Sequence, residues 1–412
     1  MFKSVEEQFE YLKKGCVEII QEDELKKKLS HSFQKNKPLL VKVGFDPTAP
    51  DIHLGHTVLL RKMKHFQDLG HDVVFLIGDF TGLIGDPSGR SATRPSMTRE
   101  EIARNAETYK TQIYKILSPQ KTIVDFNSRW LGKLTSFEII GLTSKFTVAR
   151  ILERDDFSKR FKEGLPISTH ELLYPLMQAY DSVALRADVE MGGTDQKFNL
   201  LVGRDIQREY GLEPQIIMTT PLLEGIDGVE KMSKSLGNYV GIAEPPKEIF
   251  GKIMSISDPL MFRYYELLTD VSLARIEKWK KEVSEGKVHP RDLKVQLAQA
   301  IVTDFWGKEE GQGAAEEFDR IFKHKETPAN IKVESIKLRN AETAEIEPSL
   351  LNIMMGLKIF PSRGEAKRVM QQGGVYLDGR RIDDINFQLD IAGQKEHILK
   401  IGKKKFYKFI LE

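Results

Sequence analysis

The chain has 412 residues, of which 40% are apolar and 30% are charged, and its formal net charge is +2. This composition is typical of a globular protein, and the length predicts two or three domains. No apolar run approaches the roughly 18 to 20 residues that a membrane helix needs, and the early acids Glu6 and Glu7 argue against a signal peptide. The single cysteine, Cys16, excludes an internal disulfide and a cysteine-rich zinc site. We therefore predict a cytoplasmic protein with no membrane contact and no metal site.

Positive charge is concentrated at the C-terminal end. Residues 348–412 contain 12 Lys/Arg and 7 Asp/Glu, whereas the remaining residues contain 50 Lys/Arg and 53 Asp/Glu. A basic segment on a weakly acidic body indicates contact with a polyanion, although a solubilising surface would have the same composition.

The first part of the chain predicts helices followed by a parallel sheet. Residues 1–36 have amphipathic spacing and predict helices. Next come a strand at 39–45, a helix at 54–69, a strand at 72–78, a Gly-, Asp- and Ser-rich loop at 79–97, a helix at 98–117 and a strand at 122–126. Apolar strands that alternate with helices predict an α/β, Rossmann-like parallel-sheet domain covered on both faces. Ligands bind such sheets beyond the carboxyl ends of the strands.

The remaining elements predict a return to this sheet and then two further domains. After a helical insert at 128–166, the order is helix 169–186, strand 187–191, helix 197–210 and strand 214–219. Amphipathic helices follow, for example 272–284 and 291–307, and the last 65 residues read as two short helices and then strands. We predict a catalytic domain at 1–245, a helical domain at 246–323, a linker at 324–347 and a small α+β domain at 348–412.

Two short clusters carry the strongest chemical signal. The first, His53-Leu54-Gly55-His56, lies where a strand passes into the first turn of a helix, and free backbone N–H groups at such a turn suit a phosphate. The second is Lys231-Met232-Ser233-Lys234-Ser235. Taken alone, the first could be a histidine pair in a core or on a surface, and the second a solvated loop. Together they resemble the HIGH and KMSKS signatures of class I aminoacyl-tRNA synthetases, with Leu54 in place of the usual isoleucine.

This resemblance implies attack of a carboxylate on the α-phosphate of ATP. Such a reaction depends on positioning and fixed positive potential, and it needs no general base because the nucleophile is already an anion. His53 and His56 at the helix start, and Lys231 and Lys234 on a mobile loop, would supply that potential from two sides. Gly55 would let a flat ring approach the backbone. ATP, as its Mg²⁺ complex, is therefore expected as a substrate, with no tightly bound cofactor.

Four further stretches narrow the resemblance to bacterial tyrosyl-tRNA synthetases. They are residues 44–48, 82–89, 178–181 and 192–196. The similarity covers residues 35–245, and the C-terminal unit resembles an S4 RNA-binding domain. It implies a tyrosine–tRNA ligase (EC 6.1.1.1), which forms tyrosyl-adenylate and pyrophosphate from tyrosine and ATP and then transfers tyrosine to the 3′ end of tRNA(Tyr). It also implies a homodimer that forms through the insert 128–166.

The same resemblance implies roles for individual residues. Thr48 and His53 match the pair that holds the γ-phosphate. Residues expected to bind ATP are Gly55, Gly193, Asp195 and Lys234, and those expected to bind tyrosine are Asp86, Tyr174, Gln178, Asp181 and Gln196. Most of these also have ordinary alternatives as turn, cap, packing or surface residues.

Asp181 is harder to explain in an ordinary way, because it lies on a largely apolar helix where an unpaired carboxylate is seldom buried. A site built to bind a hydroxyl rejects the analogue that lacks it, so this carboxylate favours tyrosine over phenylalanine. Members of the best-known subgroup carry a tyrosine where this chain has Lys42. The role of Lys42 and the full set of hydroxyl partners therefore stay open.

The C-terminal unit is predicted to bind RNA. Arg363, Lys367 and Arg368 share one helix face, and such residues contact phosphates with little sequence discrimination. A solvated basic surface is the alternative. Two rival functions remain, namely the same chemistry with tryptophan and a synthetase-derived RNA-binding protein, such as a splicing cofactor, with a vestigial active site. The intact histidines and lysines of the two signatures argue against the second rival.

Overall fold

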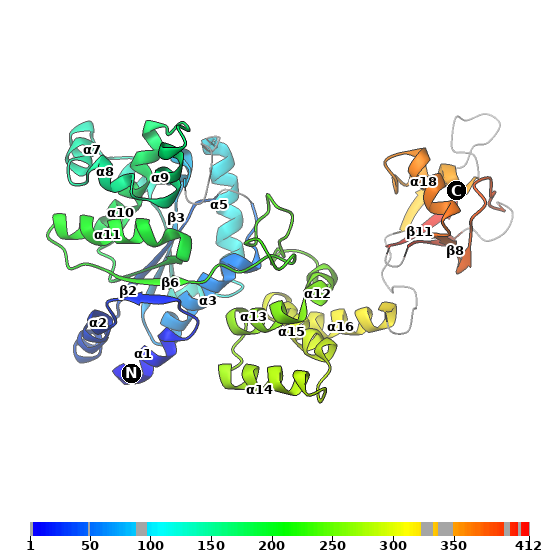
Figure 1. The fold of residues 1–412 in the computed structure, drawn as a ribbon, viewed down its shortest axis with the longest axis horizontal. Helices are drawn as coiled ribbons and strands as arrows, with labels where there is room; N and C mark the ends of the chain where they lie inside the picture. Colours follow the sequence, from blue (N-terminus) through cyan, green and yellow to red (C-terminus); the bar gives the residue numbers. More distant parts are fainter. Residues whose placement is uncertain are drawn as a thin grey trace. The chain divides into compact units, whose positions relative to one another are not determined.

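The computed structural model describes residues 3–47, 50–87, 97–322, 333–336, 349–390, 396–402 and 405–411. The chain divides into two compact units, Met1–Ala315 and Glu316–Glu412 (Figure 1). Among the described residues, no helix is long and apolar enough to cross a membrane.

The first unit is built on a six-stranded sheet with the order β1-β6-β5-β2-β3-β4. Its strands are β1 (Glu18–Ile20), β2 (Leu40–Phe45), β3 (Asp72–Ile77), β4 (Thr122–Phe126), β5 (Val189–Gly193) and β6 (Ile216–Thr220). All pairs are parallel except β1 with β6. The predicted parallel α/β sheet is thus confirmed. The antiparallel edge strand β1 lies where only helices were predicted, because three residues are too short to show a strand period.

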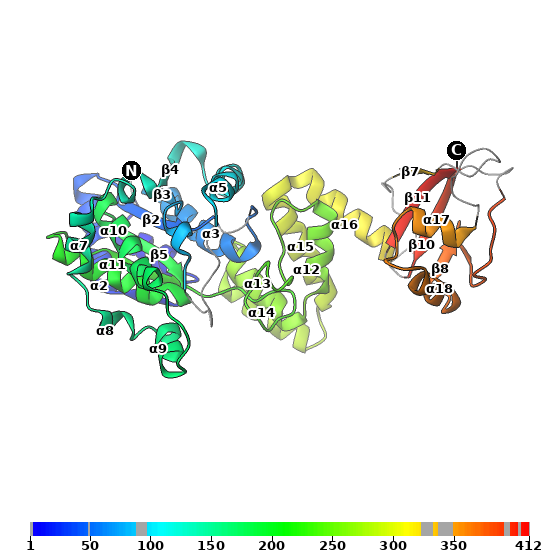
Figure 2. The ribbon, with the colours of Figure 1, turned by 90° about the horizontal axis from the view of Figure 1, so that it is seen from above.

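Helices cover both faces of this sheet (Figures 1 and 2). The connection from β2 to β3 runs through α3 (Leu54–Asp68), and the connection from β5 to β6 runs through α11 (Lys197–Glu209). Right-handed crossovers in opposite directions across a sheet place their helices on opposite faces. The crossover connections run in opposite directions on the two sides of the β5–β2 pair. A ligand site is therefore expected at the carboxyl ends of these two strands.

The other helices of this part of the unit frame the sheet and its insert. They are α1 (Val5–Lys13), α2 (Glu22–Lys35), α4 (Thr81–Ile84), α5 (Arg99–Ile113), α6 (Ser128–Leu131), α7 (Ser136–Thr143), α8 (Val148–Ile151), α9 (Asp155–Lys162) and α10 (Tyr174–Leu185). The insert helices share an apolar core with α10 and α11, which contains Leu142, Phe157 and Ile206. The insert is therefore anchored to the helices that carry the predicted tyrosine pocket.

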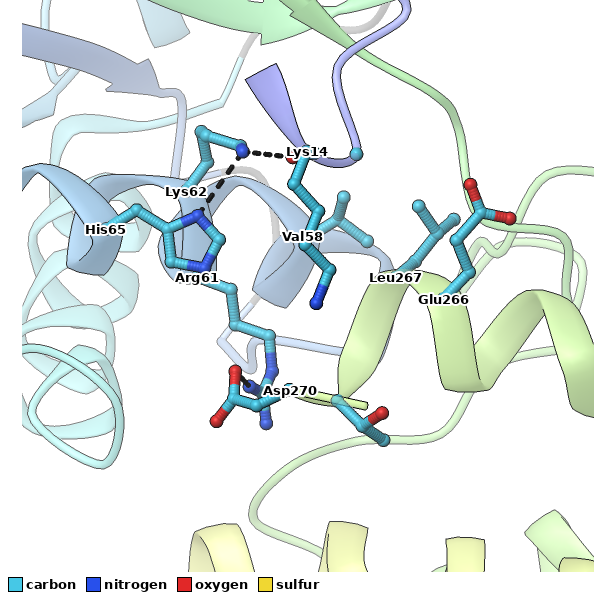
Figure 3. Close-up of a pocket in the computed structure, with 10 residues that line it drawn as sticks. Lys14, Val58, Arg61, Lys62, His65, Glu266, Leu267 and Asp270 are labelled. Carbon is cyan, nitrogen blue, oxygen red and sulfur yellow. Dashed lines mark hydrogen bonds and ion pairs between the residues drawn. The ribbon is translucent and has the colours of Figure 1, made fainter. Parts of the chain in front are cut away.

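A helical region closes the first unit and packs on α3. It contains α12 (Pro246–Ser255), α13 (Asp258–Leu268), α14 (Leu273–Ser284) and α15 (Pro290–Trp306), and it ends within α16 (Lys308–Phe322), which crosses the boundary between the two units. Figure 3 shows the junction, where Lys62 of α3 donates to the carbonyl oxygen of Lys14 and Arg61 pairs with Asp270. The cavity there, of about 30 Å³, is close to the size of one water molecule. It is a polar joint between helices and has no room for a substrate.

The second unit has a five-stranded sheet with the order β7-β11-β10-β8-β9. Its elements are β7 (Val333–Ile336), α17 (Leu350–Gly356), α18 (Arg363–Gln371), β8 (Val375–Leu377), β9 (Arg380–Arg381), β10 (Glu396–Ile401) and β11 (Lys405–Leu411). Strand β7 lies inside the segment 324–347 that we predicted to be a linker, and it pairs in parallel with β11. A four-residue strand in a polar segment has no sequence signal apart from its distant partner.

Candidate active site

A cavity of about 700 Å³ opens at the carboxyl ends of the parallel strands, where the change of direction predicts it. Its walls contain most of the residues predicted from the two signatures and from the four further stretches. These are His53, Gly55, His56, Asp86, Tyr174, Gln178, Asp181, Gly193, Asp195, Gln196 and Lys231. Thr48 lies outside the described residues, and Lys234 is not part of the wall. Arg363, Lys367 and Arg368 are exposed on α18 in the other unit.

The two signature histidines stack on each other at the start of α3. Their ring centroids are 3.8 Å apart, and the backbone N–H of His53 donates to His56 Nδ1 at 3.2 Å. Burial is the largest cause that lowers the pKa of His53 to about 2 and that of His56 to about 4, and the charge of Lys234 acts in the same direction. Both rings are therefore neutral near pH 7. Without ATP they offer hydrogen bonds, and the positive potential on this side comes from the helix start and Lys234.

Gly55 lies between the histidines and the Lys-Met-Ser-Lys-Ser loop. A Cβ atom at this position would lie 3.0 Å from the ring of His53 and 3.6 Å from Met232 Cβ. Any side chain here would push the His53 ring out of its place or push the loop away. Glycine thus keeps the first turn of α3 open toward the cavity.

The two lysines of the loop each face a carboxylate. Lys231 Nζ lies 3.1 Å from Asp195 Oδ2, and Lys234 Nζ lies 3.5 Å from Asp51 Oδ2. Met232 anchors the loop, since it is buried and its N–H donates to the carbonyl oxygen of Leu223 at 2.8 Å. Lys231 is thus paired with the carboxylate that the sequence predicts to bind ribose.

Asp86 forms a ring of hydrogen bonds with three other polar side chains. Gln196 Nε2 donates to Asp86 Oδ2 at 2.7 Å, and Asn199 Nδ2 donates to Gln196 Oε1 at 3.1 Å. Arg154, at the start of α9, closes the ring through Asn199 Oδ1 at 3.1 Å and Asp86 Oδ1 at 3.4 Å. Asp86 is thus held in one orientation by residues from two helices.

Tyr174 approaches the same end of the cavity from α10. Its hydroxyl donates to Asp46 Oδ2 at 3.0 Å, and Thr81 Oγ1 donates to Asp46 Oδ1 at 2.7 Å. Burial raises the pKa of Tyr174 well above its ordinary value, and the neighbouring carboxylates of Asp46 and Asp86 add to this effect. The hydroxyl of Tyr174 is therefore neutral; it is held by Asp46 and lies close to Asp86.

Asp181 of α10 also lines the cavity, and both of its oxygens accept hydrogen bonds. Trp130 Nε1 donates to Oδ1 at 2.7 Å, and Asn127 Nδ2 donates to Oδ2 at 3.2 Å. Burial raises the pKa of Asp181 to about 7, against the opposing effects of Lys42 and these two donors. With both donors facing it, the carboxyl is arranged as an acceptor.

Lys42, the residue that departs from the resemblance, lies below this part of the cavity. It is fully buried, and its Nζ lies 3.0 Å from Glu190 Oε1 and 3.3 Å from the carbonyl oxygen of Gln178. Gln178 Nε2 donates to the same Glu190 oxygen at 3.2 Å. Lys42 is therefore part of a buried network and does not line the cavity.

Several residues of this site were not predicted from the sequence. Asn127 follows the carboxyl end of β4, so the rule that places ligands at that edge could have indicated it. Trp130 lies in the insert 128–166, which the resemblance assigns to a dimer interface, and its indole donates to Asp181. No local pattern indicates Arg154 or Asn199, because the ring that they form with Asp86 depends on how the insert packs against α11.

Known proteins resemble this chain in sequence and in fold. The family model described as class I tRNA synthetases (W and Y) matches residues 34–323, and that of the SYY-like C-terminal domain of tyrosine–tRNA ligase matches residues 331–409. The tyrosine–tRNA ligase of Geobacter metallireducens is 55% identical over 409 residues, which cover 99% of this chain and 100% of the relative. That of Nitratidesulfovibrio vulgaris is 54% identical over 402 residues, with 98% of each chain covered.

Solved structures show the same fold at lower identity. The tyrosyl-tRNA synthetase of Archaeoglobus fulgidus, crystallised with L-tyrosine, has a TM-score of 0.62 and 24% identity, with 76% of this chain and 100% of that chain covered. The truncated mitochondrial enzyme of Aspergillus nidulans has a TM-score of 0.63 and 22% identity, with 78% and 94% covered. By its sequence the chain belongs to the class I tRNA synthetases for tryptophan and tyrosine, and within them to the tyrosine–tRNA ligases.

Proposed function

We propose that this chain activates tyrosine with ATP and transfers it to the 3′ end of tRNA(Tyr). The observation that carries the proposal is the position of Asp181, a buried carboxylate that lines the cavity and accepts hydrogen bonds from Asn127 and Trp130. A phenol hydroxyl is the donor that such an acceptor lacks. Phenylalanine would leave the carboxylate without this partner, which is costly in a buried site.

In the first step, a carboxylate oxygen of tyrosine attacks the α-phosphorus of ATP. The bond from that phosphorus to the bridging oxygen of the β-phosphate breaks, and pyrophosphate leaves with its electron pair. Tyrosine is held by Asp181 at its hydroxyl and by Asp86, Tyr174, Gln178 and Gln196 around its amino group. In the second step, a hydroxyl of the terminal ribose of the tRNA attacks the carbonyl carbon and AMP leaves.

ATP enters as its Mg²⁺ complex on the open side of the cavity. The neutral His53 and His56 donate hydrogen bonds to phosphate oxygens as charge develops, while Lys231 and Lys234 supply positive charge from the loop. Thr48 is proposed to share the γ-phosphate with His53. Asp195 and Gly193 hold the ribose, once Lys231 has left the carboxylate for the phosphates.

A homodimer is proposed to form through the insert. Its helices expose large apolar side chains, with Phe137 at 84%, Ile140 at 65% and Phe161 at 66% exposure. Exposed apolar groups that gather on one segment are typical of an interface. Phe137→Asp together with Ile140→Asp should yield a monomer in analytical ultracentrifugation, whereas a dimer of unchanged stability would exclude this surface.

The division of labour along the chain is also a proposal. Residues 1–245 would carry the catalysis, 246–323 would approach the anticodon, and 348–412 would bind the tRNA backbone through α18. A cytoplasmic location fits this function and stays a prediction.

The test is amino-acid-dependent ATP–pyrophosphate exchange with tyrosine, phenylalanine and tryptophan. Exchange with tyrosine alone, followed by charging of tRNA(Tyr), is the expected result. Exchange with tryptophan would favour a tryptophan-specific enzyme. Folded protein that binds RNA without any exchange would favour an RNA-binding protein with a vestigial active site.

A further inference from the structure

A buried ion pair lies directly below the proposed tyrosine pocket, and the reaction steps above do not use it. Lys42 on β2 and Glu190 on β5 are 0% and 1% exposed, and their charged atoms are 3.0 Å apart. Removing two charges from water is costly, and the attraction between them often no more than offsets that cost. Stability alone therefore does not account for this pair.

Both members of the pair hold the turn of α10 that faces the cavity. Lys42 Nζ donates to the carbonyl oxygen of Gln178 at 3.3 Å. Glu190 accepts from Gln178 Nε2 at 3.2 Å and from Ser182 Oγ at 3.0 Å. Asp181 lies between Gln178 and Ser182 in the sequence, so the ion pair contacts α10 on both sides of Asp181.

The groups that act on Asp181 come from three neighbouring parts of the fold. Lys42 contributes positive charge from β2 and Glu190 contributes negative charge from β5, while Asn127 and Trp130 after β4 contribute neutral donors. Asn127 also donates to Thr81 Oγ1, which donates to the carboxylate of Asp46, and Ser128 beside it donates to the carboxylate of Asp79. With the lysine present, the pair adds no net charge beside Asp181. Without it, two carboxylates would share one dry site.

We propose that Lys42 is a positioning residue for tyrosine selection, which keeps Asp181 ionised by neutralising Glu190 and by fixing the turn of α10 that carries the pocket. An ionised carboxylate only accepts hydrogen bonds, so it pairs with a phenol hydroxyl and offers nothing to a phenyl ring. This inference rests on the proposed function, because it takes Asp181 as the partner of the phenol.

The test is the pH dependence of kcat/KM for tyrosine in ATP–pyrophosphate exchange, measured with the full chain from about pH 5.5 to 9. The wild-type value should fall on the acid side as Asp181 takes up a proton. Lys42→Met should move the acid midpoint upward by about one pH unit or more, since a nearby charge shifts a pKa by about one to three units. Glu190→Gln should move it downward, because the lysine charge then acts on Asp181 without compensation.

Shifts of the acid midpoint in opposite directions indicate an electrostatic role. A merely structural role would lower kcat/KM in both single variants alike. The double variant Lys42→Met/Glu190→Gln removes both charges and should return the midpoint toward the wild-type value. If Lys42→Met does not fold, as judged by circular dichroism, Glu190→Gln and the double variant still carry the test. The control is Lys28→Met, which removes a buried lysine from a partly exposed ion pair, with Asp188 at 3.2 Å. Neither residue lines the cavity, so this variant should leave the midpoint unchanged.

Two failures can be told apart. Normal tyrosine exchange by the wild type, with midpoints that do not move or that move in one direction in both single variants, would overturn the role of Lys42 alone. A folded wild-type chain without tyrosine-dependent exchange would overturn the proposed function and this inference with it.

Discussion

Arg154 Nη2 lies 3.4 Å from Asp86 Oδ1, so a residue of the helical insert orients a carboxylate of the proposed tyrosine pocket. The same guanidinium pairs with Asp156 at 2.8 Å and donates to Asn199 at 3.1 Å. At 5% exposure, Arg154 has little access to solvent that could replace these contacts. The insert therefore contributes to the site as well as to the proposed dimer.

Arg154→Ala is expected to raise the KM for tyrosine about 10- to 100-fold, because a buried hydrogen bond to a charged group contributes about 1.5–3 kcal/mol. The KM for ATP should change much less, because Arg154 contacts Asp86, Asp156 and Asn199, none of which is proposed to bind ATP. Exchange kinetics with each substrate varied in turn would measure both. The control is Arg150→Ala, an exposed arginine of the same insert that pairs with Glu153. A parallel rise in both KM values would indicate general damage to the fold.

Asp181→Asn should abolish the preference for tyrosine. The variant replaces an acceptor by an amide of similar shape, and the ratio of kcat/KM for tyrosine and phenylalanine should fall by at least about 100-fold. Gln178→Glu, one turn earlier, should affect binding without erasing the preference for a hydroxyl. An unchanged ratio in Asp181→Asn would place the phenol elsewhere in the cavity.

The pKa of Asp181, raised by burial to about 7, also predicts a pH effect on stability. The folded-state pKa lies above the ordinary value near 4. The contribution of Asp181 to the free energy of unfolding is therefore complete below about pH 4 and is lost as the pH rises through 7. Asp181→Asn should remove this loss, so its melting temperature should fall less between pH 5 and 8 than that of the wild type. Circular dichroism melts at several pH values would measure the difference, and parallel curves would contradict the assignment.

His53 and His56 are expected to act in adenylate formation and not in tyrosine binding. Substitution of either by alanine should lower kcat for exchange by about 100-fold, the usual cost of removing one donor to developing charge. The Kd of tyrosine without ATP should stay the same in equilibrium dialysis. His65→Asn, on the same helix but at the junction of Figure 3, is the matched control. Weaker tyrosine binding in His53→Ala would contradict this role.

The second unit is expected to serve tRNA and not amino-acid activation. The chain should be cut after Phe322, where α16 ends, because β7 belongs to the sheet of the second unit. The shortened protein should keep pyrophosphate exchange and lose most of its charging of tRNA(Tyr). In the full chain, alanine at Arg363, Lys367 and Arg368 together should weaken charging and reduce its salt dependence. Charging that survives both changes would remove the second unit from tRNA binding.

The sequence by itself determined the features that depend on neighbours along the chain. The start of α3 at His53 and the order of the parallel strands from β2 to β6 with the helices between them follow from local apolar patterns. The two signatures and the four matching stretches identify the family because their residues are contiguous. The carboxyl-end rule then predicted where the cavity would open.

Only the tertiary structure decided which distant side chains meet. Lys42 and Glu190 come from β2 and β5, Trp130 and Asp181 from the insert and α10, and β7 pairs with a strand far along the chain. None of these pairs leaves a periodic or local trace, because each depends on the packing of separate elements. The neutral state of His53 belongs to this class too, since burial by the folded chain is the main cause of its low pKa.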